Sequence, residues 1–180
     1  MLVNRNPFVT KMNIPKPLPL HGIRVVEFTH MVMGPTCGMV LADLGVHGLT
    51  LCDTTGMAYP TQAATLTRAA RLRWPGTELT LHFHNTRGMG LANVLAAVQG
   101  GIERFDGSLG GLGGCPYAPG ASGNVVTEDL VFMFEAMGIA TGINLARLIA
   151  ARAPLQAGLP GEPLYGMTPE AGLPKGWLLV

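Results

Sequence analysis

Apolar and polar positions along this 180-residue chain predict strands and helices that alternate. Segment 22–28 (GIRVVEF) is a short apolar run rich in β-branched residues, which is typical of a strand. A helix is expected after it, with Pro35 as its first residue and Gly45 as its stop signal. Within 89–98, apolar residues recur at the i, i+3, i+4, i+7 spacing of an amphipathic helix. The same criteria predict strands at 49–53, 78–84 and 102–109, and helices at 61–73, from 127 onward and at 144–151.

The two ends of the chain show no such pattern. Residues 1–20 are expected to form a mobile tail, and residues 155–180, which are rich in proline and glycine, an ordered but irregular segment. Between them, strand, helix and strand follow one another with polar residues after the strands. That order is how (βα) proteins build sites at the carboxyl ends of their strands.

Two histidines give the first candidate site. His82 and His84 are two residues apart on a predicted strand, so their side chains point to the same face and can approach one ion or one substrate. The alternative is a pair of half-buried strand histidines with ordinary hydrogen-bond partners. A second candidate is Cys115, which lies in the glycine-rich loop 110–123, although an isolated cysteine is as often an inert buried thiol. Asp53, at the end of another predicted strand, is either a site residue or a turn-capping aspartate.

Composition narrows the class of protein. Hydrophobic residues make up 48% of the chain and charged residues 13%, which excludes a disordered chain. The net charge of +1 provides no basic stripe for nucleic acid, and no apolar run reaches the length of a membrane helix. Three cysteines without a CxxC pair argue against a disulfide framework, so a reducing cytoplasm is the expected location.

The loop GLGGCPYAPGASGN (111–124) lies between HFHNTRG (82–88) and TEDLVFMFEAMGIATGI (127–143). Together these motifs closely resemble the hydroxymethylglutaryl-CoA lyase family, and the resemblance covers about residues 49–177. It implies an α/β fold that is the C-terminal portion of a TIM (β/α)8 barrel, incomplete in this chain. It also implies retro-aldol cleavage of a 3-hydroxy-3-methylglutaryl-CoA-like thioester to acetyl-CoA and a 3-keto acid.

The resemblance also implies roles for individual residues. His82, His84 and Asn124 match the family's metal-ligand positions, and two imidazoles with one amide oxygen suit Mg²⁺ or Mn²⁺. Cys115 matches the catalytic cysteine, Asp53 an active-site carboxylate, and His82 is a catalytic residue as well as a ligand. The implied partner is an acyl-CoA thioester.

The chain departs from the family at its other motif. These lyases carry an RDG motif that supplies a catalytic arginine and a further aspartate ligand, and no RDG occurs in this sequence. Only about four strands are expected, whereas a barrel needs eight. We therefore expect little lyase activity from this chain alone, and unpaired sheet edges that favour a homo-oligomer or a companion subunit.

A second resemblance concerns only PLHGIRVVEFTHMVMGPTCGMVLADLG, residues 19–45, which is similar to the start of class III CoA-transferases. The expected organisation is thus a tail (1–20), a transferase-like strand and helix (21–46) and a lyase-like partial barrel (47–180). A fusion, a truncated gene or a misread frame would each produce this pattern. Two alternative functions stay open: a CoA-transferase fragment and a non-catalytic protein that retains the metal site.

Overall fold

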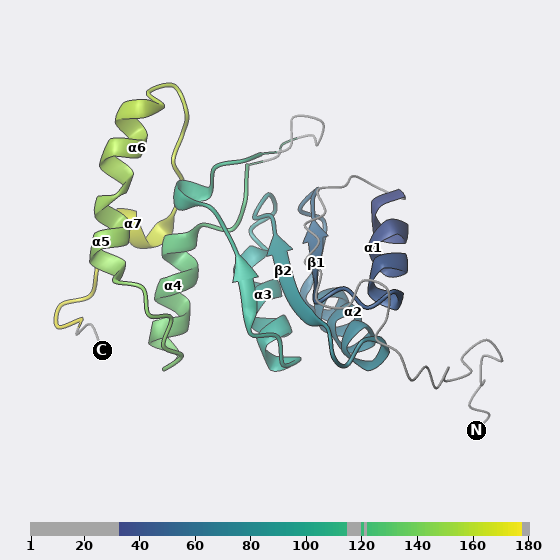
Figure 1. The fold of residues 1–180 in the computed structure, drawn as a ribbon. Helices are drawn as coiled ribbons and strands as arrows, with labels where there is room; N and C mark the ends of the chain where they lie inside the picture. The colour runs from purple at the N-terminus through teal and green to yellow at the C-terminus, as the bar shows by residue number, and fades with distance from the viewer. Residues whose placement is uncertain (1–32, 115–119, 121, 178–180) are drawn as a thin grey trace.

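The computed structural model describes residues 33–114, 120 and 122–177. In this part of the chain, three parallel strands form a sheet in the order β1-β2-β3. They are β1 (Gly48–Asp53), β2 (Glu78–Phe83) and β3 (Arg104–Asp106). All three arrows point the same way in Figure 1, so their carboxyl ends meet at one edge of the sheet.

Helices connect the strands and cover the sheet (Figure 1). The first three are α1 (Met33–Asp43), α2 (Pro60–Arg73) and α3 (Gly90–Gln99). Helices α2 and α3 pack side by side behind the sheet, whereas α1 lies beside β1. None of the described helices is long and apolar enough to cross a membrane.

The core is apolar and lies between the sheet and these helices. Leu81 and Phe83 of β2 and Val94 and Ala97 of α3 are all at most 5% exposed. Burying a side chain of the size of Leu or Phe stabilises the fold by about 1.5–3 kcal/mol, so this contact is what places α3 against β2.

The chain beyond β3 forms a second group of short helices. They are the 3-10 turn η1 (Leu109–Gly111) and the helices α4 (Thr127–Ala136), α5 (Leu145–Ala150), α6 (Arg152–Gly158) and α7 (Met167–Ala171). Helix α4 contacts η1, α5 and α7, so it is the centre of this group (Figure 1).

Most of the expected elements are present with bounds that differ by one or two residues. Helix α1 begins before Pro35, and Gly45 adopts a φ of 88° just after the helix ends. Residues 22–28 and 1–20, where a strand and a mobile tail were expected, lie outside the described residues. The described sheet has three strands and two free edges, β1 and β3, and it is not closed.

Three elements differ from the expectation in ways that depend on distant contacts. The strand expected at 102–109 is only Arg104–Asp106, because after Gly107 the backbone leaves β2, and Ser108 donates its N–H to Val125 O. The strand expected to reach His84 ends at Phe83, and His84 instead pairs with the returning chain at Asn124.

The segment 155–180 was expected to be irregular, yet it contains the end of α6 and all of α7. Helix α7 begins at the buried carboxylate of Asp129, which accepts the N–H groups of Met167 and Thr168 at 3.0 and 2.7 Å. A distant acid therefore caps this helix, and such a partner is not visible in the local pattern.

Candidate functional site

The carboxyl ends of the three strands bring the candidate residues together. In the parallel register, Cys52 of β1 pairs with His82 of β2, and His82 pairs with Asp106 of β3. Asp53 is the last residue of β1, and His84 follows the end of β2. Residues from three separate segments thus meet at one edge of the sheet.

His82 is held by an acidic neighbour. Its Nδ1 lies 2.5 Å from Oδ1 of Asp106, and its side chain is 23% exposed. This hydrogen bond raises the pKa of His82 above its ordinary value of 6.5, even though burial acts in the opposite direction. Because Nδ1 is bonded to Asp106, Nε2 is the ring nitrogen left to bind a metal ion. Metal-binding histidines commonly have this arrangement, with a carboxylate on one nitrogen and the ion on the other.

His84 is more deeply buried, with 6% of its surface exposed. Its ring centroid lies 5.1 Å from that of His82 in an edge-to-face arrangement. The two rings are therefore neighbours, as their spacing predicts. Burial lowers the pKa of His84, and the nearby His82 lowers it further, so the neutral ring is favoured. Its Nδ1 is buried and has no hydrogen-bond partner among the described residues.

Asn124 reaches the site because the chain after the glycine-rich loop crosses the end of β2. The backbone of Asn124 pairs antiparallel with His84, and Val125 donates its N–H to Phe83 O at 2.9 Å. Nδ2 of Asn124 donates to Leu112 O at 2.7 Å. Its Oδ1 is buried, and the amide lies close enough to His82 for a side-chain hydrogen bond that raises the pKa of that ring.

Asp53 has two different oxygens. Oδ1 accepts the N–H groups of Met57 and Ala58 at 2.9 and 3.2 Å, so the turn-capping interpretation is correct for this atom. Oδ2 is buried and lacks a partner within the described segments. Burial raises the pKa of Asp53 above its ordinary value. The negative charge of Asp53 in turn acts to raise the pKa of both histidines.

Three buried atoms at the candidate site are of types that can bind a divalent cation. Asp53 Oδ2, His84 Nδ1 and Asn124 Oδ1 are nitrogen and oxygen atoms of the kind that bind Mg²⁺ or Mn²⁺, and a buried polar atom without a partner is costly. Among the described residues, no group of three or more His, Cys, Asp and Glu side chains is arranged to hold a metal. Asn124 is not among these residue types, so the set of His82, His84 and Asn124 stays a prediction. Cys115 lies outside the described residues, so its place relative to this set stays a prediction.

Asp106 was missed by reasoning from sequence. It lies within the expected strand 102–109, and the signal that could have identified it is an acid directly followed by glycine at a strand's end. Its importance depends on the parallel register with His82, which the local pattern does not reveal.

Comparison with known proteins decides the family. Residues 19–154 match the HMGL-like family. This chain belongs to the HMGL-like family. The match begins at residue 19, so it includes the segment 19–45, whose similarity to CoA-transferases stays a prediction.

Individual relatives of this HMGL-like protein are lyases. The chain is 52% identical to (R)-citramalyl-CoA lyase of Chloroflexus aurantiacus over 130 residues, which are 72% of this chain and 41% of that protein. It is 52% identical to a hydroxymethylglutaryl-CoA lyase of Bacillus subtilis over 111 residues, 62% of this chain and 37% of the relative.

A solved structure agrees with these relatives. It is an HMG-CoA lyase of Acinetobacter baumannii in complex with coenzyme A and 3-methylmalate, 48% identical, with a TM-score of 0.71. The superposition covers 81% of this chain and 47% of that one, so the chain spans less than half the length of each of these three relatives. The expected fold class is confirmed: this is part of a TIM barrel of the lyase family.

Proposed function

We propose that this chain carries part of the active site of a metal-assisted lyase that acts on a 3-hydroxyacyl-CoA thioester. The reaction is cleavage of a 3-hydroxy-3-methylglutaryl-CoA-like substrate to acetyl-CoA and a 3-keto acid. The observation that supports it most is the contact between the rings of His82 and His84 at the strand ends, with Asn124 and Asp53 both near enough to His82 to raise the pKa of its ring. Two lyase relatives that act on related CoA thioesters support the substrate class.

In this proposal His82, His84 and Asn124 hold Mg²⁺ or Mn²⁺. When bound, such an ion would polarise the oxygen atoms of the substrate's 3-hydroxyl and carboxylate groups. The chain's own contacts favour the forms of these side chains that bind metals. Burial lowers the pKa of His84, so its ring is neutral and can bind through a nitrogen. Leu112 O accepts a hydrogen bond from Nδ2 of Asn124, which leaves Oδ1 of that amide for the ion. Asp106 holds the His82 ring in one orientation.

The proposed reaction also needs proton transfers. Burial raises the pKa of Asp53, so its carboxyl accepts a proton more readily than an exposed aspartate does, as a general base for the substrate hydroxyl requires. We assign to Cys115 the return of a proton to the acetyl-CoA enolate, and His82 is the second described group that can carry a proton nearby. These assignments follow the motif positions and stay predictions.

We further propose that this chain alone turns over slowly. It lacks the RDG motif, and with it an arginine and an aspartate that would stabilise developing charge. By analogy with oxyanion donors, each missing group costs on the order of 10²-fold in rate. A companion subunit at the free edges of the described sheet, β1 and β3, is the proposed source of the missing groups, because a second copy of this chain would lack the same motif.

The first experiment measures Mn²⁺ binding by the electron paramagnetic resonance signal of the free ion. We expect the purified chain to bind one Mn²⁺, and His84→Ala to weaken binding at least tenfold, by the usual effect of losing a ligand. His47→Ala is the matched control, because His47 bonds to Glu78 at the opposite end of the strands. Equal affinity in His84→Ala and the unchanged protein would reject the site.

The second experiment follows acetyl-CoA release from hydroxymethylglutaryl-CoA with Mg²⁺ or Mn²⁺, beside a full-length lyase. The proposal expects a rate at least one hundredfold below that control. Turnover within tenfold would show that other residues of this chain replace the missing groups. The transferase alternative rests on segment 19–45 alone, and CoA transfer from succinyl-CoA to a dicarboxylic acid would favour it instead.

A further inference from the structure

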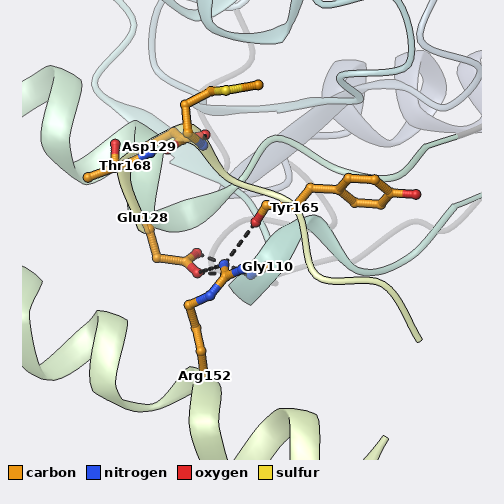
Figure 2. Close-up of polar contacts among 7 residues, drawn as sticks. Gly110, Glu128, Asp129, Arg152, Tyr165 and Thr168 are labelled. Carbon is orange, nitrogen blue, oxygen red and sulfur yellow. Dashed lines mark hydrogen bonds and ion pairs between the residues drawn. The ribbon is translucent and has the colours of Figure 1, made fainter. Parts of the chain in front are cut away.

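We infer that Glu128 and Arg152 form a buried ion pair that positions the amide of Asn124 for metal binding. This inference rests on the proposed function, because it concerns the same candidate site. Glu128 is the second residue of α4 and Arg152 the first of α6, so the pair belongs to the helical group beyond β3 and not to the strand ends (Figure 2).

The pair is withdrawn from water. The side chain of Glu128 is fully buried and that of Arg152 is 16% exposed. Nη1 of Arg152 donates to Oε1 of Glu128 at 2.5 Å and to the carbonyl oxygen of Tyr165 at 2.8 Å. A buried pair contributes little net stability compared with apolar residues of similar size, so its presence is better explained by the geometry that it imposes.

The ion pair fixes the position of the Gly110 backbone. The N–H of Gly110 donates to both carboxylate oxygens of Glu128, at 3.2 and 3.1 Å. On its other side, Gly110 O accepts the N–H of Tyr165 at 2.8 Å. Arg152 holds both partners, because it bonds to the carboxylate of Glu128 and to the carbonyl of Tyr165 (Figure 2). The backbone of Gly110 is thus fixed by its own amide and its own carbonyl.

Gly110 is connected to Asn124 through Leu112, which lies two residues after Gly110 and accepts a hydrogen bond from the Asn124 side chain. Leu112 O accepts both Oγ of Ser108 at 2.5 Å and Nδ2 of Asn124 at 2.7 Å. Since Nδ2 is occupied, Oδ1 is the atom left for a ligand, and it is buried in an amide that lies beside the ring of His82. A Cβ atom on Gly113 would lie 2.7 Å from Nδ2, so the amide has no room on that side. Moving Gly110 would move Leu112 O and with it the amide.

A purely structural pair would hold α4 to the helices after it and nothing more. Asp129 does this without touching Gly110, since its carboxylate accepts only from Met167 and Thr168 in the described contacts. Asp129→Asn is therefore a control for general loosening of the same helix. Measuring metal affinity and stability on the same variants distinguishes a pair that positions Asn124 from a pair that only stabilises the helical group.

The experiment measures the Mn²⁺ dissociation constant and the thermal midpoint of the full chain. We expect Arg152→Met to weaken Mn²⁺ binding about tenfold, the lower end of the range for outer-shell groups of a metal site. Arg152→Lys should recover part of this loss. Asp129→Asn should lower the thermal midpoint but leave the affinity within twofold. If Arg152→Met does not fold, Glu128→Leu combined with Arg152→Met removes both charges and is expected to show the same loss of affinity.

The outcomes separate this inference from the proposed site. Wild-type affinity in Arg152→Met, or an equal loss in Asp129→Asn, would overturn the positioning role while the metal site stands. Absence of Mn²⁺ binding in the unchanged protein would overturn the site, and the positioning role with it.

Discussion

Gly123 allows the chain after the glycine-rich loop to pass close to η1, and replacing it tests this approach directly. Its φ is +118°, and a Cβ atom built on it would lie 1.9 Å from the carbonyl oxygen of Gly111, whereas ordinary contacts begin near 3.4 Å. Gly123 O also accepts the N–H of Asn85 at 2.9 Å, and the next residue is Asn124. In Gly123→Ala the two backbones must therefore separate, and Asn124 must move with them.

Gly138→Ala isolates the cost of the backbone angle alone. Gly138 has a φ of +76° just after α4, and nothing lies within 4 Å of its Cβ position. A left-handed alanine costs about 1–2 kcal/mol, which we expect for Gly138→Ala. Gly123→Ala carries a similar strain plus forced displacement of packed groups, about 1–3 kcal/mol. The expected loss in free energy of unfolding is therefore about 2–5 kcal/mol for Gly123→Ala.

Urea unfolding followed by circular dichroism measures both variants, and Mn²⁺ titration measures the site. Gly123→Ala should bind Mn²⁺ at least tenfold more weakly, since the Oδ1 of Asn124 is displaced, whereas Gly138→Ala should bind as the unchanged protein does. If Gly123→Ala is no less stable than Gly138→Ala and keeps its Mn²⁺ affinity, the close approach to Gly111 does not position the site.

Three further changes test packing, capping and titration. Leu145 is fully buried, so Leu145→Ala should lower the free energy of unfolding by about 2–5 kcal/mol in urea, whereas Leu72→Ala, at 78% exposure, should change it by less than about 0.5 kcal/mol. Asn144→Ala removes the acceptor that caps α5 and should cost about 1 kcal/mol in the same assay, with Asn144→Asp close to the unchanged protein. In an NMR titration of the metal-free protein, the pKa of His82 should lie above 6.5, because its hydrogen bond to Asp106 favours the charged ring, and Asp106→Asn should lower it. The pair thus stabilises the fold fully below pH 6.5 and loses this contribution as pH rises through the folded-state pKa of His82, so a value at or below 6.5 would contradict the assignment.

Elements whose causes are local were predictable from the sequence. The helix expected at 61–73 is α2, which begins one residue earlier with a proline in its first turn. The helix expected at 144–151 is α5, and Asn144 caps it by accepting a first-turn N–H at 3.0 Å. Proline, glycine and asparagine act on their own backbone within a few residues, so their effect can be derived from position alone.

Elements with distant causes were not predictable in the same way. Met137 continues the apolar spacing of Leu130 and Phe134, but α4 ends at Ala136 and Met137 is 45% exposed. Acids in a helix's first turn, such as Glu128 and Asp129, favour the helix dipole, but here both are buried and accept hydrogen bonds from the backbone of Gly110 and of α7. A first-turn acid has the same local pattern in either role, and only the packing of later helices decides between them.

The sequence by itself determined which residues could form the site. The two-residue spacing of His82 and His84, and the family motif that ends in Asn124, name candidate ligands before any contact is known. Only the tertiary structure decided their partners: the parallel register sets Asp106 beside His82, and the return of the chain after the loop sets Asn124 beside His84. Spacing along one strand is a property of the backbone, whereas contacts between segments 24 or more residues apart depend on strand order and on the burial that stabilises it.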